Sequence, residues 1–165
     1  QRSFKEEIND EKTKKKMTQE FIDYYSKNID KESVPLSGAI DFFKWAKSKN
    51  ISMAVCTNKQ ERLAVDLLKK LDLFQYFEYI AGSDTFSFNK PDPRHLTDVV
   101  EIIGGNLKKT IMVGDSEVDA NSAHNANLPF VLVKDGYTEK SEKEIKHDEL
   151  INDFVGFEKI IEKYL

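Results

Sequence analysis

Five side chains in this sequence are of the types that handle a phosphate group together with a divalent cation. They are Thr57, Asn58, Lys90, Asp115 and Asp119. A hydroxyl beside backbone amides at a helix start, an ammonium group and a pair of carboxylates suit a phosphate and a metal ion. At about 4 Å and an effective dielectric near 20, one like-charge pair costs on the order of 4 kcal/mol, so carboxylates face a phosphate only with cations between them. We therefore expect Lys90 and a metal to compensate the charge.

The segments around these residues alternate between extended and helical patterns after Val34 and Pro35. Apolar strands are expected at 51–56, 77–81, 110–113 and 130–133. Helices are expected at 38–49, 60–71, 92–103, 117–126 and 157–164. This alternation predicts an α/β fold, a Rossmann-like three-layer core with a mostly parallel sheet.

For the first of these helices, the sequence also predicts the N-cap residue and the residues that face the core. Ser37 is the expected N-cap of helix 38–49, and Ile40, Phe43 and Ala46 are expected to face inward.

The five side chains follow the expected strands at the points where sites form in parallel sheets. Thr57 and Asn58 follow the first strand, Lys90 lies in the loop after the second, and Asp115 follows the third. Because the carboxyl ends of parallel strands share one edge, these side chains are expected to meet there. Taken singly, Thr57 with Asn58 reads as a helix cap, Lys90 as a solvated loop and Asp115 as a turn; the combination favours a site.

The first 33 residues are polar and rich in lysine, but apolar residues recur there at near-helical spacing. One or two amphipathic helices are expected. The charge run from Lys12 to Lys16 is interpreted as a solvated face.

Composition narrows the classes of function. The chain has 165 residues, 39% of them apolar, and a net charge of −4, which offers no continuous basic surface for nucleic acid. Cys56 is the only cysteine, and no apolar run reaches the roughly 18 residues of a membrane span, so a cytoplasmic protein is expected. We expect a small phosphorylated metabolite as the partner, with no nucleic acid and no membrane, and we leave a homodimer open.

Three segments resemble the motifs of the haloacid dehalogenase-like hydrolases. The run 54–59 (AVCTNK) resembles their second motif, 89–93 (NKPDP) their third, and 111–119 (IMVGDSEVD) their fourth. The segments 82–85 (GSDT) and 135–137 (DGY) are similar to the phosphoglycolate phosphatase branch, except that Ser83 stands where a glycine is usual.

The resemblance implies a Mg²⁺-dependent phosphatase acting on a small phosphomonoester, with 2-phosphoglycolate as the leading substrate. It implies that Thr57 and the Asn58 backbone N–H hold phosphoryl oxygens and that Lys90 neutralises developing charge. Asp115 would ligate Mg²⁺, and Asp119 would support the metal site or orient Lys90. Residues 1–33 would be the remnant of a helical cap domain, and residues 34–165 the core without its first strand.

The family's first motif has the form Asp-x-Asp on the opening strand and carries the nucleophile. The chain contains no Asp-x-Asp, and neither Asp84 nor Asp92 follows an apolar strand as required. In this fold the opening strand lies between the strands that carry Thr57 and Asp115, so its absence leaves a central gap with several unsatisfied backbone groups, at about 1 to 3 kcal/mol each. We expect an upstream segment in the full protein, a hypothesis consistent with a chain that opens on Gln1, and we expect the chain by itself to be inactive.

Two alternatives remain open, and a third conflicts with the order of the residues. A phosphosugar mutase or a pyrophosphatase of the same superfamily would share the motifs, and a non-catalytic binding fragment fits a chain without a nucleophile. A phospho-signalling receiver domain also combines aspartates, a hydroxyl and a lysine, but its aspartate precedes the hydroxyl and its lysine comes last, whereas here the hydroxyl is first and Asp115 follows.

Overall fold

A computed structural model describes Thr13, Lys16 and residues 33–136 and 138–164. The chain divides into two compact units, residues 1–34 and 35–165. The helices expected in the first 33 residues, and the charge run there, lie outside the described residues apart from these few positions, so the identity of that unit as a cap remnant stays a prediction. The structure below is that of the second unit.

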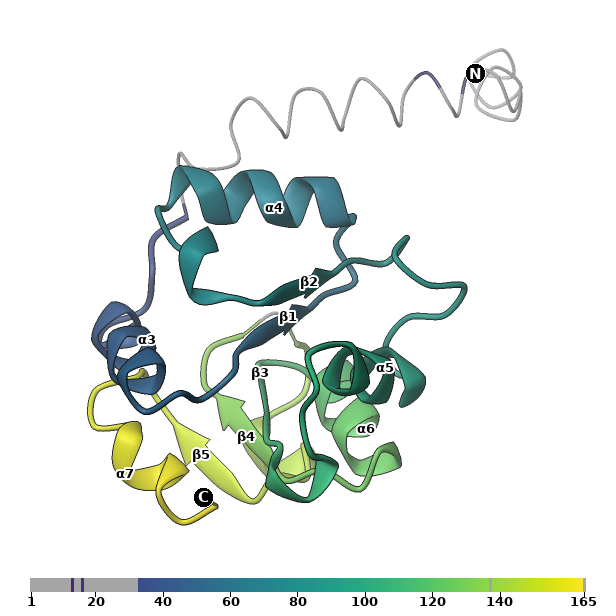
Figure 1. Cartoon of the computed structure of the whole chain (residues 1–165). Helices are drawn as coiled ribbons and strands as arrows, with labels where there is room; N and C mark the ends of the chain where they lie inside the picture. Colours follow the sequence, from purple (N-terminus) through teal and green to yellow (C-terminus); the bar gives the residue numbers. More distant parts are fainter. Residues whose placement is uncertain (1–12, 14–15, 17–32, 137, 165) are drawn as a thin grey trace. The chain divides into compact units, whose positions relative to one another are not determined.

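The second unit alternates strands and helices, as the sequence pattern predicts (Figure 1). Its strands are β1 (Ala54–Cys56), β2 (Tyr79–Ala81), β3 (Met112–Gly114), β4 (Phe130–Val133) and β5 (Glu149–Ile151). Its α-helices are α3 (Ala39–Ser48), α4 (Glu61–Lys70), α5 (Arg94–Ile102), α6 (Glu117–Asn125) and α7 (Glu158–Ile161). Short 3₁₀ turns occupy Phe74–Tyr76, Leu107–Lys109 and Glu142–Glu144.

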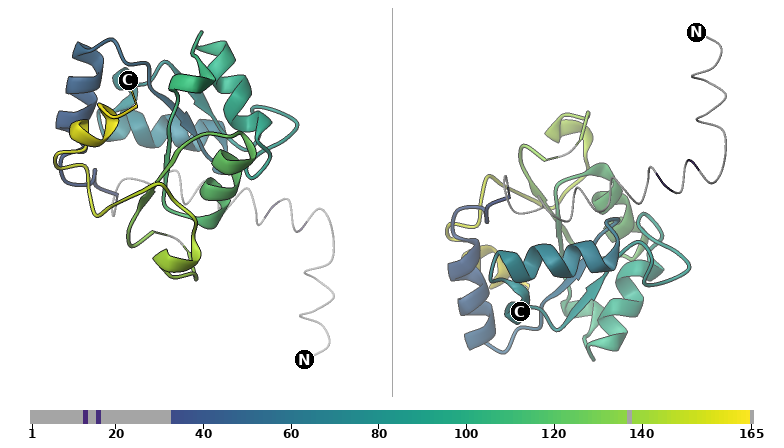
Figure 2. Two further views of the ribbon diagram at one scale, coloured as in Figure 1. Left: turned by 90° about the horizontal axis from the view of Figure 1, so that it is seen from below. Right: turned by 90° about the horizontal axis from the view of Figure 1, so that it is seen from above.

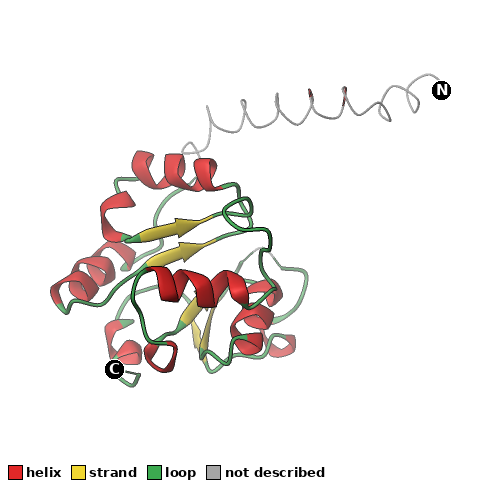
Figure 3. Ribbon diagram, turned by 45° about the vertical axis from the view of Figure 1, so that its right-hand side comes forward, coloured by secondary structure: helices red, strands yellow, loops and turns green. Residues whose placement is uncertain are grey.

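All strand pairs are parallel, and they form two separate sheets. One contains β1 and β2, and the other has the order β3-β4-β5 (Figure 3). Among the described residues no backbone hydrogen bond joins β1 to β3. The three residues of β1 and of β3 are only half-buried, whereas all four residues of β4 are buried. The sheet is therefore interrupted between the strands that precede Thr57 and Asp115.

Strand β4 shows why this unit has three layers. Val131 and Val133 face one cluster with residues of α3 and α7, and Phe130 and Leu132 face the other with residues of α5 and α6. Because successive strand residues point to opposite faces, an all-apolar strand indicates burial on both sides. Figure 2 shows α3 beside α7 and α5 beside α6, in agreement with their contacts. The predicted α/β three-layer core is confirmed for this unit.

Several sequence details were wrong at element ends. The N-cap of α3 is Gly38 at φ 76°, not Ser37. The Ser37 carbonyl instead accepts a hydrogen bond from the Phe154 N–H, and a Cβ on Gly38 would lie 2.6 Å from the Phe154 carbonyl carbon. This close approach and the positive φ require glycine at position 38. Ile40 is 39% exposed rather than inward, because Ala39 and Ala46 define the buried face.

Other boundaries shifted and one strand was missed. The pairings of β1, β2 and β3 last only three residues each, so these strands begin two or three residues later than predicted. Helix α7 is shorter than the predicted 157–164. Strand β5 has no counterpart among the sequence predictions, because three residues without an alternating flank give no clear strand pattern.

Candidate active site

The predicted site residues lie at the carboxyl ends of β1 and β3 and in the loop after β2. Thr57 directly follows β1 and Asp115 directly follows β3. The Thr57 N–H donates to the Ala81 carbonyl at 2.9 Å, which continues the β1–β2 ladder. The Thr57 hydroxyl accepts from the Lys59 N–H at 3.1 Å, so it is fixed at the turn that leads into α4.

Lys90 and Asp119 form a buried ion pair at the centre of this region. The Lys90 Nζ lies 2.5 Å from Asp119 Oδ1, and the two side chains are 9% and 8% exposed. A lysine with so little exposure needs such a partner, because an unpaired buried charge is costly. The pair joins the loop after β2 to the first turn of α6.

The local sequence explains why Asp119 lies where it does. Ser116 is the N-cap of α6, and its hydroxyl accepts from the Asp119 N–H at 3.3 Å and donates to Asp119 Oδ2 at 2.8 Å. The Asp115 N–H also donates to Asp119 Oδ2, at 3.1 Å. A carboxylate in the first turn of a helix is favoured by the helix dipole. The start of α6 therefore holds Asp119 against Lys90.

Hydrogen bonds connect the predicted residues into one continuous chain. The Asn58 Nδ2 donates to the Lys90 carbonyl at 2.9 Å, the Lys90 ammonium binds Asp119, and Asp119 binds the Asp115 backbone. Four of the five predicted residues are linked in this way, and the fifth, Thr57, is the neighbour of Asn58. The structure thus brings together segments that lie far apart in the sequence.

Electrostatics fix the charge states of the central groups. Burial alone would raise the pKa of the Asp119 carboxyl, but the charge of Lys90 and hydrogen bonds from Lys90, Ser116 and the Asp115 backbone lower it below its ordinary value. Asp119 is therefore a carboxylate opposite an ammonium. Burial raises the pKa of the Cys56 thiol to about 11, with Lys90 acting in the opposite direction, so Cys56 is not a thiolate nucleophile.

The carboxylates differ in their fitness for a metal ion. In the part of the chain that the structure describes, no three His, Cys, Asp or Glu side chains gather as a metal site. Both oxygens of Asp119 already accept from protein donors, so direct ligation by Asp119 would have to replace one of these contacts. Mg²⁺ often takes one or two protein carboxylates and completes its shell with water and phosphate oxygens, a demand that Asp115 fits. Asp119 fits the alternative role of orienting Lys90.

Asp115 also borders a cavity of about 700 Å³ beside β4. Its lining includes Val133, Lys134, Thr138 and Lys140, and it does not include Thr57 or Lys90. Gly136 packs tightly against Asp115, since a Cβ there would lie 2.3 Å from the Asp115 Cβ. The loop after β4 therefore also restricts the position of Asp115.

Sequence reasoning missed three contributors to this geometry: the side-chain amide of Asn58, the cap Ser116 and the tight glycine Gly136. The run from Asp115 to Asp119 contains a recognisable capping pattern that indicates the role of Ser116. The contacts of Asn58 and Gly136 join residues separated by 32 and 21 positions, and local sequence gives no signal for them.

Comparison with known proteins decides the family. Residues 1–133 match the family described as haloacid dehalogenase-like hydrolase. This chain belongs to the haloacid dehalogenase-like hydrolases. It is 40% identical over 134 residues to a phosphoglycolate phosphatase of Mesorhizobium japonicum, a match that covers 81% of this chain and 59% of that protein. It is 43% identical over 148 residues to a phosphoglycolate phosphatase of Agrobacterium fabrum, which covers 87% of this chain and 64% of that protein.

Solved structures agree with this membership. The crystal structure of a predicted phosphoglycolate phosphatase from Haemophilus somnus matches with a TM-score of 0.86 at 25% identity, over 92% of this chain and 68% of that chain. A β-phosphoglucomutase from Clostridium difficile matches with a TM-score of 0.77 at 24% identity, over 94% and 68%, and shows the shared fold alone. The chain spans about three fifths of the length of the first curated relatives it matches. Among its described residues, no helix has the length and apolar character needed to cross a membrane.

Proposed function

We propose that this hydrolase chain forms most of a Mg²⁺-dependent phosphatase that hydrolyses a small phosphomonoester, with 2-phosphoglycolate as the leading substrate. The observation that carries the proposal is the linked chain of Asn58, Lys90, Asp119 and Asp115 at the ends of β1 and β3. Similarity to proteins named phosphoglycolate phosphatase supports the choice of substrate.

In this proposal each residue has a defined task. The Thr57 hydroxyl and the Asn58 backbone N–H hold phosphoryl oxygens, as a hydroxyl and a helix-start amide do in other anion sites. Lys90, held in place by Asp119, neutralises negative charge on the phosphoryl group as it transfers. A bound Mg²⁺ at Asp115 would supply further charge neutralisation.

The nucleophile in this proposal is an aspartate on a strand that lies between β1 and β3. The interruption of the sheet at that place supports the idea, as does the fraction of the relatives' length that the chain spans. A strand there would pair with the free edges of β1 and β3, satisfy their backbone groups and place its carboxyl end between Thr57 and Asp115. The chain by itself is then expected to lack activity.

The test is phosphate release by the protein extended with the residues encoded before Gln1. With Mg²⁺, we expect release from 2-phosphoglycolate or a generic aryl phosphate. Lys90→Met and Asp115→Asn should each lower kcat by roughly 10²-fold or more, the scale of losing one electrostatic stabiliser. Lys108→Met is the matched control at an exposed position and should leave kcat unchanged.

Absence of phosphate release in all proteins, with Asp115→Asn indistinguishable from the parent, would contradict the proposal. Conversion of a phosphosugar into its isomer without net release of phosphate would favour the mutase alternative.

A further inference from the structure

The side chain of Asn58 makes a contact that its expected role in phosphate binding does not use. That role belongs to its backbone N–H, whereas its Nδ2 donates a hydrogen bond of 2.9 Å to the backbone carbonyl of Lys90. A peptide carbonyl can only accept, so the amide must present its nitrogen there. The contact spans 32 positions and joins the end of β1 to the loop after β2.

The loop that begins at Lys90 is held through three consecutive carbonyls. Lys90 accepts from Asn58, Pro91 accepts from Asn125 Nδ2 at 3.4 Å, and Asp92 accepts from the Ser122 hydroxyl at 3.5 Å. The contact from Asn58 is the shortest of these three and the one that comes from the strand edge beside Thr57. The other two come from α6. The chain thus contains two asparagines that make the same kind of bond to neighbouring carbonyls.

Lys90 is consequently fixed at both ends. Asn58 holds its backbone and Asp119 holds its ammonium group. A lysine side chain has four rotatable carbon–carbon bonds, so an anchor at the ammonium alone leaves the path of the stem undetermined. An additional anchor at the backbone fixes where the stem begins relative to Thr57, the neighbour of Asn58, and so narrows the positions open to the ammonium.

We propose that the side chain of Asn58 is a positioning group for Lys90, which couples the phosphate-holding turn at Thr57 to the ammonium that neutralises the phosphoryl charge. The inference rests on the proposed function for its kinetic consequence but not for its structural one. Asn58→Ala removes the side-chain donor and keeps the backbone N–H, so it separates the two roles of this residue. Asn58→Asp keeps the shape but replaces the donor with an acceptor, which cannot bind a carbonyl.

The first measurement is the labelling rate of the Lys90 amine by acetic anhydride, read by peptide mass spectrometry in the upstream-extended protein. We expect Asn58→Ala and Asn58→Asp to raise this rate at least about threefold, because a loosened stem exposes the amine. The matched control Asn125→Ala removes the longer bond to the next carbonyl and should leave the rate at the parent value. An unchanged Lys90 rate in both Asn58 variants overturns the inference, whether or not the protein is a phosphatase.

The second measurement is steady-state kinetics with 2-phosphoglycolate. We expect Asn58→Ala to lower kcat by roughly 10- to 100-fold while KM changes much less, since misplacement of a stabilising group acts mainly on the transition state. Asn125→Ala should retain the parent kcat. A parent protein without activity would refute the proposed function and leave the labelling rate to decide this inference. An active parent whose kcat survives Asn58→Ala would overturn it.

Discussion

At the scale of single residues, the ion pair of Lys90 and Asp119 is the feature with the largest energetic consequence. Both partners are nearly inaccessible to solvent, and Asp119 receives further hydrogen bonds from Ser116 and the Asp115 backbone. Burial of two charges gains little net stability, but removal of one partner leaves the other uncompensated. The pair therefore constrains the site more than it stabilises the fold.

Substitutions at these two residues should have non-additive effects on the free energy of unfolding. Lys90→Met should lower the free energy of unfolding by about 3–5 kcal/mol, because it leaves the Asp119 carboxylate buried and unpaired. The double variant Lys90→Met with Asp119→Leu should be less destabilised than Lys90→Met alone. Urea unfolding of the parent protein, Lys90→Met, Asp119→Leu and the double variant measures the coupling energy between the two residues.

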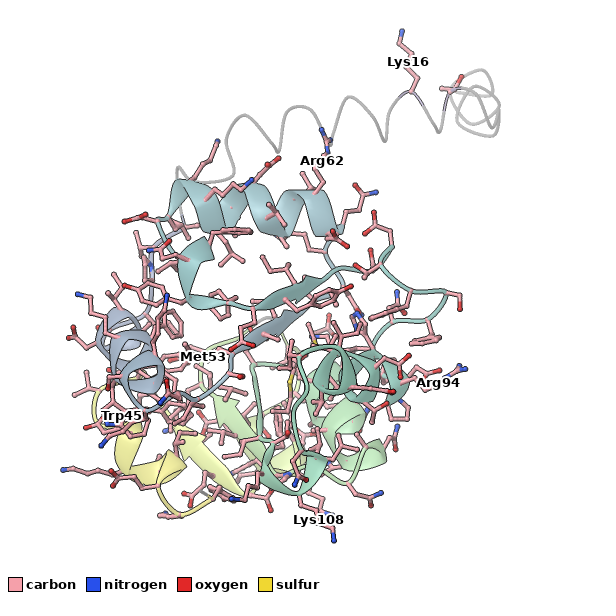
Figure 4. All side chains as sticks on the ribbon, in the orientation of Figure 1. Lys16, Trp45, Met53, Arg62, Arg94 and Lys108 are labelled. Carbon is pink, nitrogen blue, oxygen red and sulfur yellow. The ribbon has the colours of Figure 1, made fainter. Side chains whose placement is uncertain are left out.

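The exposed pair of Arg94 and Asp92 provides the control for that cycle. Arg94 points outward at the start of α5 (Figure 4), and its side chain is 63% exposed. Arg94→Ala should hardly change the urea midpoint, since solvent screens such pairs. A double variant as unstable as the sum of its single variants would show that Lys90 and Asp119 are not coupled.

His95 predicts a loss of stability in mild acid. Its ring is fully buried, and among the described residues neither ring nitrogen has a hydrogen-bond partner. Burial, and then the charge of Lys90, lower the pKa of His95 below its ordinary 6.5, although the nearby Gly82 backbone, Asp92 and Asp98 act in the opposite direction. The unfolded chain then binds the proton more readily than the folded one. The free energy of unfolding should therefore be unaffected by His95 above pH 6.5. It should fall as the pH drops below 6.5, by at most about 1.4 kcal/mol per pH unit.

Urea unfolding at pH 7.0 and 5.5 tests this titration. His95→Gln should lose less stability over that interval than the parent protein. His147→Gln, which keeps His95, should lose as much as the parent. Equal acid losses in the parent and in His95→Gln would contradict the assignment.

At the scale of elements, apolar runs and strand-end residues were sufficient to predict four of the strands and the positions of Thr57, Lys90 and Asp115 at their ends. Element ends were less predictable, since the cap of α3 is decided by the close approach of the Phe154 backbone to Gly38. Strand β5 depends on pairing with β4, a tertiary contact without a local pattern. The same holds for the site. The types of its residues and the loops that carry them could be predicted from local sequence, whereas the contact of Asn58 with Lys90 depends on the path of a distant loop.

The junction of β2 and α4 supports a prediction at this scale. A Cβ on Gly82 would lie 2.1 Å from the Glu61 backbone nitrogen, so the loop after β2 and the start of α4 are in direct backbone contact. Asp84 Oδ1 accepts from the Glu61 N–H in the same place, at 2.8 Å. Gly82→Ala should cost about 1–3 kcal/mol, because the backbone must shift. Thermal unfolding measures the loss.

Gly104→Ala is the comparison for that change. Gly104 has a φ of 67° but no heavy atom within 4 Å of an added Cβ, so it should show backbone strain alone, of about 1 kcal/mol. If Gly82→Ala were as stable as the parent protein, the close backbone contact between the loop after β2 and the start of α4 would be contradicted.

At the scale of the whole molecule, the main feature is the interruption of the sheet between β1 and β3. Among the described residues of 35–165 there are two parallel sheets, and the strands that lead into Thr57 and Asp115, β1 and β3, are each paired on one side only. Apolar residues next to both strands, Met53 and Ile111, pack against the same hydrophobic cluster. The two halves thus share a core without sharing a backbone ladder.

Hydrogen exchange tests the proposed strand between β1 and β3. Amides of β1 and β3 should exchange more slowly in the upstream-extended protein than in the 165-residue chain, because the extension supplies their missing partners. Amides of β4, which is already paired on both sides, should change least. Identical exchange of β1 and β3 in the two proteins would argue against a strand at this place.

The convergence of the three motifs on one phosphate site is tested most directly by amide NMR of the upstream-extended protein during titration with inorganic phosphate in the presence of Mg²⁺. We expect the amide signals of Thr57, Asn58, Lys90 and Asp115 to shift together with a single dissociation constant, and Lys90→Met to raise that dissociation constant. Shifts confined to one of these segments, or separate constants for different segments, would contradict this expectation.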